Sequence, residues 1–538
     1  MSNTIGFTNF RKFTNFPTID LGDITILVGG NNAGKSTLVK AMLLMRDFLK
    51  SRIDSSKYSK NTSKPFKPEF SFDSEHVNIG EFYRAFCRQS SPKEDTISFK
   101  MKIGKFFFIV NVKGERKPGV IPEVSLIAVS DEERDISFTF DFTEGQMTAR
   151  FGNDRKGLQK DSNAGKIVDR FKVLNDLKRR LTMSTDLAEV SNLKLQIERL
   201  EKEIELQKHA LNFNITEEDS VTVEISNLKG FSVGELVISE LIKSLLHYSE
   251  SGTLGDRRFR GYKEQLSSKS FLDGKSSLIR KIVDELEQTI NSQAIEYIYA
   301  HSVYQDSVYA QCANSSDYTK RTIHEFYTSR ISKGDKEFSM IEEWLQKFKI
   351  GTSLKVVPYR GDNYSLVIFD EENPEIKGER RKGYPGGIDL ADKGMGSIQL
   401  VILLLRLATL IRKYKGQQLT ILLEEPEQNL HPAVQSQLAD LINNINKDFG
   451  VRFIIETHSE YLVRHTQVLA AKQIYEEKVP LSKVNEIIKV YYISRERGMV
   501  DMLFLDNAKF DDHFDDGFFD QAARESLTIS RLERINKK

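Results

Sequence analysis

Cysteine, net charge and long apolar runs are all scarce in this chain. The 538 residues include only two cysteines, Cys87 and Cys312, and neither belongs to a C-x-x-C pair. This argues against a structural zinc site and favours a reducing compartment. The formal net charge is +1, so no global field indicates a nucleic-acid partner, although a local basic patch stays open.

Membrane-spanning segments are also lacking. The most apolar helix expected from the sequence runs from Ile398 to Ile411, and Gln399 and Arg406 bracket its purest part. That part falls far short of the roughly 20 residues that cross a bilayer. The N-terminus lacks the apolar core of a signal peptide. We therefore expect a cytoplasmic protein without membrane contact, built as several domains or as one large elaborated domain.

One glycine-rich stretch carries the strongest chemical signal. It follows the apolar run Ile24–Val28 and precedes a segment with apolar residues at helical spacing, so the expected order is strand, loop and helix. It fits G-x-x-x-x-G-K-[ST], the Walker A loop that cradles nucleotide phosphates. We expect Lys35 to reach the β- and γ-phosphates and Ser36 to ligate Mg²⁺. The nucleotide-binding residues expected here are Gly29, Gly30, Asn31, Asn32, Ala33, Gly34, Lys35, Ser36 and Thr37.

The segments that follow this loop in the sequence predict first a β-sheet and then charged helix. Period-two patterns near 97–103 and 136–142, with apolar runs between them, indicate a half-buried antiparallel sheet. Residues 165–212 are charged and helical, with two seams of heptad-spaced leucine and isoleucine. Two interpretations stay open for that stretch: a short antiparallel helical hairpin, or one amphipathic helix lying on the body.

Further elements are expected on either side of these segments. A strand at Thr4–Phe7 is followed by a polar turn before the glycine-rich stretch. Residues 232–250 and 323–349 read as helices. Leu354–Pro358 and Tyr364–Phe369 are typical of a β-hairpin.

A second set of motifs lies in the C-terminal half. The apolar strand 419–423 ends in Glu424 and Glu425, the form of a Walker B segment. We expect Glu424 to hold Mg²⁺ and Glu425 to be the catalytic base that activates water. A further apolar strand, Arg452–Thr457, precedes His458, which could contact a γ-phosphate. A single histidine would be read as an ordinary loop residue, so His458 gains weight only from the motifs around it.

Glycines also precede the apolar helix near residue 398. Gly394, Gly396 and Ser397 lie just before it, and a helix N-terminus can bind an anion. They cannot serve the same phosphates as a filled Walker A loop, so we expect them to act in trans, on the nucleotide of another protomer. Arg11 and Phe13 precede the loop, and either could pack on adenine.

Together these motifs resemble the ABC-type ATPases of the branch that contains SMC, RecF and the overcoming-lysogenisation-defect (OLD) ATPases. The segments 424–432, 456–459, 392–397 and 517–520 carry the resemblance. It implies ATP and Mg²⁺ as ligands, an ATPase activity, and dimers that sandwich nucleotide. The Leu-Ser-Gly-Gly-Gln signature of transporter ATPases is missing, and no glutamine occurs near Asn78–Phe82, where the family has a lid segment. The C-terminal TOPRIM nuclease of full-length OLD proteins and an HNH array are missing as well.

The stand-alone form resembles the ATPase subunits of Septu-type anti-phage defence systems, including those linked to retrons. This implies a sensor or regulatory subunit that controls a separate HNH-type nuclease encoded nearby. A retron reverse transcriptase and its noncoding DNA are further partners that the resemblance implies. Two alternatives stay open: a RecF- or SMC-like DNA repair ATPase, and a scaffold that binds ATP without hydrolysis and restrains a toxic effector. The DNA contacts of the first would come from basic clusters at 257–260 and 377–382.

The expected fold class is α/β: an ABC-type P-loop ATPase with a mixed central sheet, an antiparallel β subdomain and an inserted helical region. We divide the chain into four parts. Residues 1–160 form an N-terminal ATPase lobe, 161–293 a helical and coiled-coil insertion, and 294–507 a C-terminal ATPase lobe. Residues 508–538 form an acidic-then-basic tail, and its aspartates are expected to be solvated rather than to bind Mg²⁺.

Overall fold

The computed structural model describes most of the two predicted ATPase lobes. The described residues are 3–53, 68–91, 95–151, 219–224, 269–299, 309–310, 318–359, 363–370, 387–494 and 496–536, together with Ile197. The predicted seams at 165–212, the helix expected at 232–250 and both basic clusters lie outside these residues, apart from Ile197.

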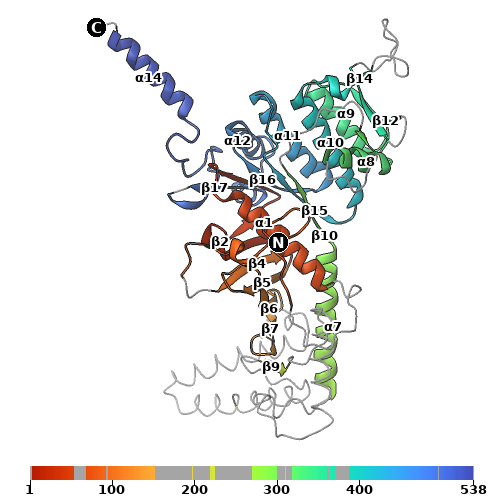
Figure 1. Ribbon diagram of the computed structural model, residues 1–538, viewed down its shortest axis with the longest axis vertical. Coiled ribbons are helices and arrows are strands. Elements are labelled where there is room, and N and C mark those ends of the chain that lie inside the picture. Colours follow the sequence, from red (N-terminus) through yellow and green to blue (C-terminus); the bar gives the residue numbers. More distant parts are fainter. Residues whose placement is uncertain are drawn as a thin grey trace.

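A mixed sheet forms the centre of the molecule (Figure 1). Its strand order is β10-β15-β16-β3-β17-β18, in which the first five strands are parallel and β18 is antiparallel to β17. The bounds are β10 (Gln293–Ile298), β15 (Gln418–Glu424), β16 (Arg452–Thr457), β3 (Ile24–Gly29), β17 (Ile488–Ser494) and β18 (Gly498–Asp501). Strands buried on both faces read as continuous apolar runs, as predicted here. The α/β fold class with a mixed sheet is confirmed.

A second sheet is antiparallel throughout. Eight of the described strands form it, in the order β2-β1-β4-β5-β6-β7-β8-β9. The bounds are β1 (Asn3–Phe10), β2 (Phe13–Leu21), β4 (Thr96–Ile103), β5 (Phe106–Lys113), β6 (Glu123–Asp131), β7 (Ile136–Asp141), β8 (Gln146–Phe151) and β9 (Asp219–Glu224). In β4 and β7 every second residue is buried, so the period-two prediction is confirmed. The prediction of a mere turn after β1 is wrong: β2 lies there, and as an edge strand it tolerates Pro17.

Helices cover the mixed sheet on both faces. One face packs on α1 (Lys35–Ile53), which lies between the two sheets, and the other on the C-terminal helices. The remaining helices are α2 (Phe82–Ala85), α7 (Lys269–Asn291), α8 (Tyr318–Thr328), α9 (Lys336–Lys347), η4 (Leu390–Asp392), α10 (Met395–Lys413), α11 (Pro432–Phe449), α12 (Glu460–Tyr475), α13 (Leu481–Ile487) and α14 (Gln521–Asn536). A small sheet joins β11 (Tyr309–Ala310), β12 (Ser353–Tyr359), β13 (Asn363–Phe369) and β14 (Gly387–Asp389), and the predicted β12–β13 hairpin is confirmed.

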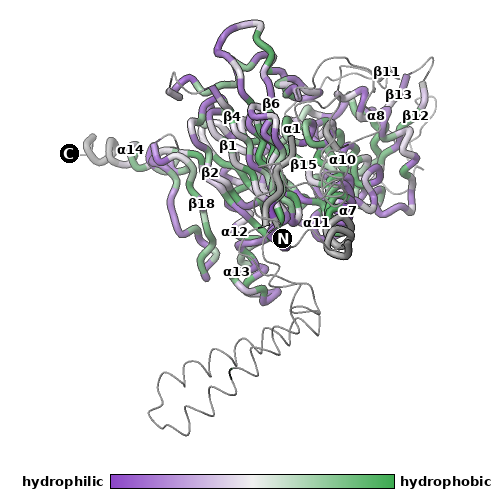
Figure 2. The backbone as a smooth tube through the Cα atoms, turned by 90° about the horizontal axis from the view of Figure 1, so that it is seen from below, coloured by the Kyte–Doolittle hydropathy of each residue, from purple (hydrophilic) through white to green (hydrophobic). Residues whose placement is uncertain are grey.

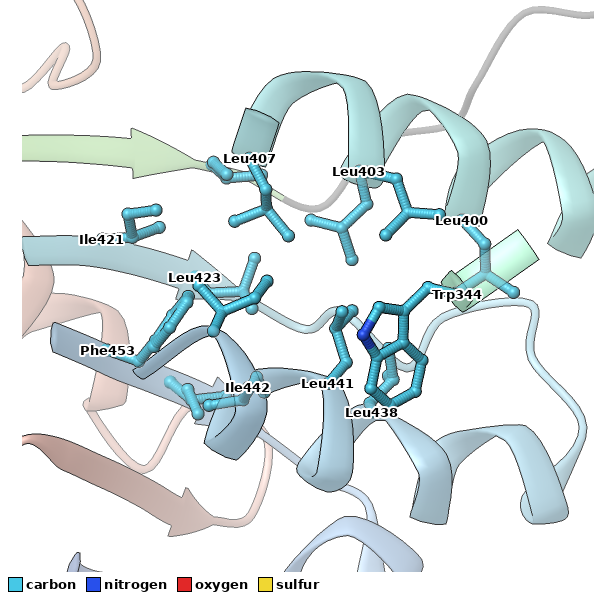
Figure 3. Close-up of a cluster of buried hydrophobic side chains, with 14 of the residues drawn as sticks. Trp344, Leu400, Leu403, Leu407, Ile421, Leu423, Leu438, Leu441, Ile442 and Phe453 are labelled. Atoms are coloured by element: carbon cyan, nitrogen blue, oxygen red, sulfur yellow. The ribbon is translucent and has the colours of Figure 1, made fainter. Parts of the chain in front are cut away.

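Helix α10 is the core of the C-terminal layer. Its leucines lie against Trp344 of α9, the inner face of β15 and helix α11 (Figure 3). Among the described residues it is the one helix long and apolar enough to cross a membrane by length and composition, but 72% of its apolar window is buried inside the protein. Buried Arg406 bonds Glu325 of α8 and lies 3.8 Å from Glu296 of β10, which ties the layer to the sheet.

Two sequence predictions need correction in this half. The single helix expected at 323–349 is two helices, α8 and α9, because the chain turns at Gly334 with φ +102°. The aspartates after residue 510 are not simply solvated. Asp512 and Asp515 are ion-paired with Arg497, while Phe514 and Phe518 pack on Tyr492 at the sheet edge. Helix α14 projects from the body, on the side opposite β12 (Figure 2).

Helix α7 is fastened to the hairpin ends of the antiparallel sheet by Glu285. Its carboxylate accepts hydrogen bonds from Arg134 (2.7 and 3.0 Å) and from Lys105. The bond from Arg134 and the neighbouring Lys105 lower the pKa of Glu285 to about 2.

Glu285→Gln is therefore expected to lower stability by about 1–2 kcal/mol at pH 7, because it removes a charge-assisted, partly exposed contact. The depressed folded pKa places this contribution above the unfolded pKa of about 4.3, and it fades as pH falls toward 2. Urea unfolding at several pH values measures the gap between variant and wild type. A gap that stays constant down to pH 3, or an equal loss in the exposed control Glu132→Gln, would contradict the assignment.

Candidate functional site

The Walker A loop connects β3 to α1 as the sequence predicts. Ala33 N–H bonds Gly30 O (3.1 Å) and Thr37 N–H bonds Gly34 O (3.0 Å), which closes the loop onto the helix. Gly34 has φ +114°, and a Cβ there would lie 2.5 Å from the Phe13 ring. Glycine is thus required on two counts. Phe13 packs under the loop and against Phe7, so of the two adenine candidates only Arg11 lines the pocket.

Lys35 is held by the loop itself. Its Nζ donates to the carbonyls of Gly29 (2.9 Å) and Gly30 (3.3 Å) and lies 2.9 Å from His458 Nε2. Only 3% of the side chain is exposed. Burial lowers the pKa of Lys35, and the nearby Glu456 carboxylate opposes that shift. The amine is in place for phosphates that would replace the carbonyls as partners.

Ser36 bonds the carboxylate of Glu456, which the sequence motifs do not identify as a site residue. Its Oγ donates to Glu456 Oε1 (2.8 Å), and Glu456 stands in register beside Glu424 across the β15–β16 pair. The other oxygen, Glu456 Oε2, is buried without a hydrogen-bond partner among the described residues. Burial raises the pKa of Glu456 to about 7. A bound cation would satisfy that oxygen and reverse the shift.

These oxygen donors fit Mg²⁺. Ser36, Glu424 and Glu456 offer hydroxyl and carboxylate oxygens, the ligands that this cation prefers. No group of three or more His, Cys, Asp or Glu side chains in the described part of the chain is arranged as a metal cage. That suits Mg²⁺, which keeps water and takes phosphate oxygens beside one or two carboxylates.

Glu425 directly follows the C-terminal end of β15 and has a strained backbone conformation. Its φ is +39°, a region that non-glycine residues rarely occupy, and its N–H is fixed to Glu456 O (2.7 Å). The carboxylate lies 3.2 Å from His458 Nε2 and accepts a bond from Gln428. His458 thus touches both Lys35 and Glu425, and burial, followed by the Lys35 charge, lowers its pKa. A neutral ring can accept from Lys35 or donate to a phosphate.

Glu427 fixes the loop that presents His458. Its Oε1 accepts from Thr457 Oγ1 and from the His458 N–H, both at 2.7 Å. Burial raises the pKa of Glu427. Ser459 then caps α12 through Leu462 N–H (3.1 Å) and bonds Gln435 of α11. Loop, helix cap and Walker B segment therefore form one connected unit.

A pocket of about 750 Å³ opens over the Walker A loop. Its lining combines that loop with Glu425, Glu456 and His458, and with the rim residues Arg11, Lys12, Lys40, Arg84, Phe86, Cys87, Arg88 and Gln89. The five rim cations have no ion-pair partner among the described residues. They suit an anion with several negative charges, such as a triphosphate. Nothing in the local sequence pattern of 84–89 signalled this role, because the folding of α2 against β1 brings the segment there.

The three residues expected to act in trans, called the signature residues from here on, lie outside this pocket. Gly394 is the N-cap of α10, and Gly394, Gly396 and Ser397 are not among the residues that line the pocket. A Cβ on Gly396 would come within 2.9 Å of Asn429 O, so the turn after Walker B packs directly on it. Gln399 bonds both Pro426 O and Asn429 Nδ2 (3.3 Å each). The signature is thus attached to the Walker B turn of its own chain rather than to its own Lys35.

The comparisons with known proteins agree with a nucleotide-binding chain. The family described as AAA ATPase domain matches residues 1–463. The chain belongs to the AAA ATPase domain family. No curated protein matches this AAA ATPase.

The solved structures that the chain matches include two Smc head domains. One, from Pyrococcus furiosus, has an extended coiled coil and is bound to the C-terminal domain of ScpA. It shows 12% identity and a TM-score of 0.29, with 99% of both chains covered. Another, an SmcHead bound to the C-winged helix domain of ScpA, shows 11% identity and a TM-score of 0.31, covering 93% of this chain and 97% of that one. Likeness at these scores does not bear on function.

Glu425→Gln is expected to bind ATP but to hydrolyse it about 10²–10³-fold more slowly, because the amide cannot accept a proton from water. The variant should accumulate as locked dimers. Steady-state phosphate release and fluorescent-nucleotide binding measure the two effects. Lys35→Ala is the control that should lose binding itself. If Glu425→Gln turns over as fast as wild type, Glu425 is not the base.

Proposed function

We propose that this AAA ATPase binds and hydrolyses ATP at sites shared between two protomers. The proposal rests on the separation of the signature residues from the pocket over the Walker A loop. One pocket collects Lys35, Ser36, Glu425, Glu456 and His458, while the signature turn lies outside it. A helix N-terminus with exposed glycine is suited to a phosphate supplied by a second copy.

The residues of the pocket have separable roles. Lys35 would exchange the loop carbonyls for the β- and γ-phosphates, and Ser36 and Glu424, with Glu456 beside them, would hold Mg²⁺. The cation, when bound, neutralises charge on the β- and γ-oxygens. Glu425 orients and deprotonates the attacking water, and His458, relieved of Lys35, donates to the γ-phosphate. Gly394, Gly396 and Ser397 of the second protomer close the site. Positioning and charge neutralisation are what phosphoryl transfer requires.

We further propose that the dimer is the sensor and regulatory subunit of an anti-phage complex that controls a separate HNH-type nuclease. The support is the motif resemblance to Septu-type ATPases, which is an analogy at the level of family. Cytoplasmic location follows from the same proposal. The protein purified with the neighbouring products of its native operon should carry a nuclease subunit in fixed ratio. Purification as a lone chain would contradict this role and favour a self-contained DNA repair ATPase.

The rate of phosphate release distinguishes an ATPase from a scaffold that only binds ATP. A scaffold that only binds ATP would release no phosphate above background with nucleotide still bound. A DNA repair ATPase would bind duplex DNA with a steep dependence on salt. Both measurements use the full chain.

Mixing two inactive variants tests the shared site most sharply. Lys35→Ala removes the Walker A amine, and Ser397→Arg blocks the signature, so each alone should be inactive. An equal mixture is expected to recover about a quarter of wild-type turnover, since random pairing makes half of the dimers mixed and each holds one intact site. Recovery is measured as phosphate release after mixing. Mixtures as inactive as the separate variants, or a Ser397→Arg protein as active as wild type, would refute sharing in trans.

A further inference from the structure

Strand β10 brings a tyrosine to the Walker B carboxylate. β10 runs parallel to β15 at the sheet edge, and Tyr297 is in register with Leu422, two residues before Glu424. The Tyr297 hydroxyl donates a hydrogen bond to Glu424 Oε2. Neither the motif patterns nor the family description assigns any role to this residue.

The bond has a fixed direction. The phenol hydroxyl of Tyr297 is the donor, and a carboxylate oxygen of Glu424 is the acceptor. A donor that occupies one carboxylate oxygen restricts the rotation of Glu424 and leaves Oε1 for a cation. Glu456, whose Oε2 is buried without a hydrogen-bond partner in the described part of the chain, stands beside it in register. The two carboxylates therefore present free oxygens at the same edge of the sheet.

Aromatic contacts in turn hold the Tyr297 ring. It stacks on Tyr299 at 5.6 Å with an interplanar angle of 19°, and the His76 ring lies 5.4 Å away. Tyr299 also meets Tyr318 of α8 at 5.1 Å. The Tyr297 ring is thus contacted by His76 of the loop before α2 and by Tyr299, which itself packs on helix α8.

An ion pair closes the same junction. Arg321 of α8 bonds Glu75 Oε1 (3.0 Å), and Glu75 lies 3.8 Å from the His76 ring. The loop at 71–80 and strand β10 therefore hold Tyr297 directly, and helix α8 supports both of them through Glu75 and Tyr299. A side chain clamped in this way keeps its rotamer, which is what an outer-shell partner of a metal ligand needs.

We propose that Tyr297 is a positioning residue that aims Glu424 at the Mg²⁺ of the nucleotide site, with the His76–Tyr299 stack holding it in place. The inference rests on the proposed function, because it takes Glu424 as a ligand of that ion. Tyr297 touches neither nucleotide nor metal and acts through Glu424 alone.

Tyr297→Phe is the direct test because it removes one hydroxyl and keeps the ring stack. Tyr414→Phe is the matched control, because it also removes a phenol hydrogen bond to a glutamate but the acceptor is Glu296 of β10 rather than Glu424. Metal binding is measured by electron paramagnetic resonance, titrating Mn²⁺ into protein that holds a non-hydrolysable ATP analogue. The Mg²⁺ dependence of phosphate release gives a second readout. Nucleotide affinity without metal reports whether the pocket itself is intact.

The expected result is about a tenfold weaker Mn²⁺ affinity in Tyr297→Phe, the size typical of losing an outer-shell partner. The Mg²⁺ concentration for half-maximal turnover should rise equally, while the metal-free nucleotide affinity of Tyr297→Phe and all readouts of Tyr414→Phe should match wild type. Unchanged or tighter Mn²⁺ binding in Tyr297→Phe overturns this inference alone. A wild-type protein that binds no Mn²⁺ beside the nucleotide overturns both this inference and the proposed function.

Discussion

The parallel pairing of β16 with both β3 and β15 is the constraint on which the site depends. It aligns Thr457 with Val28 and Glu456 with Glu424, so three strand ends meet at one edge. The Walker A lysine and His458 are 423 residues apart in sequence yet 2.9 Å apart in space. Ligands gather at the carboxyl ends of strands in open parallel sheets for this reason.

The negative charge of the glutamates at these strand ends favours a bound cation. Glu424, Glu425, Glu427 and Glu456 crowd around one buried lysine, and burial raises the pKa of Glu427 and of Glu456. Close carboxylates without a cation are unfavourable, and a divalent ion with its phosphates would relieve them. The strained φ of Glu425 fits the same picture, because strain of this kind persists where the surrounding contacts over-determine it. These charges support the proposed binding of ATP and Mg²⁺ at this site.

Local patterns predicted the parts of this structure that depend on neighbours in sequence. The loop after β3, the acids after β15 and the strand before His458 all appear where the sequence placed them. The sequence motifs did not predict a role for Glu456, because that role depends on the register of Glu456 with Glu424 across two strands. An acid just before Thr457-His458 at a strand tip was the available signal. Tyr297, Arg84 and Arg88 reach the site only through tertiary packing, which no periodicity encodes. The same holds for β2, whose Pro17 reads as a turn until its edge position is known.

The proposed sharing of nucleotide between two copies can be measured on the wild-type chain. Native mass spectrometry of the wild-type chain with Mg²⁺ and a non-hydrolysable ATP analogue measures this directly. We predict a dimer that carries two nucleotides and reverts to monomer when the nucleotide is removed. A chain that binds one nucleotide and stays monomeric at every concentration would contradict a shared site, whatever its role in the cell.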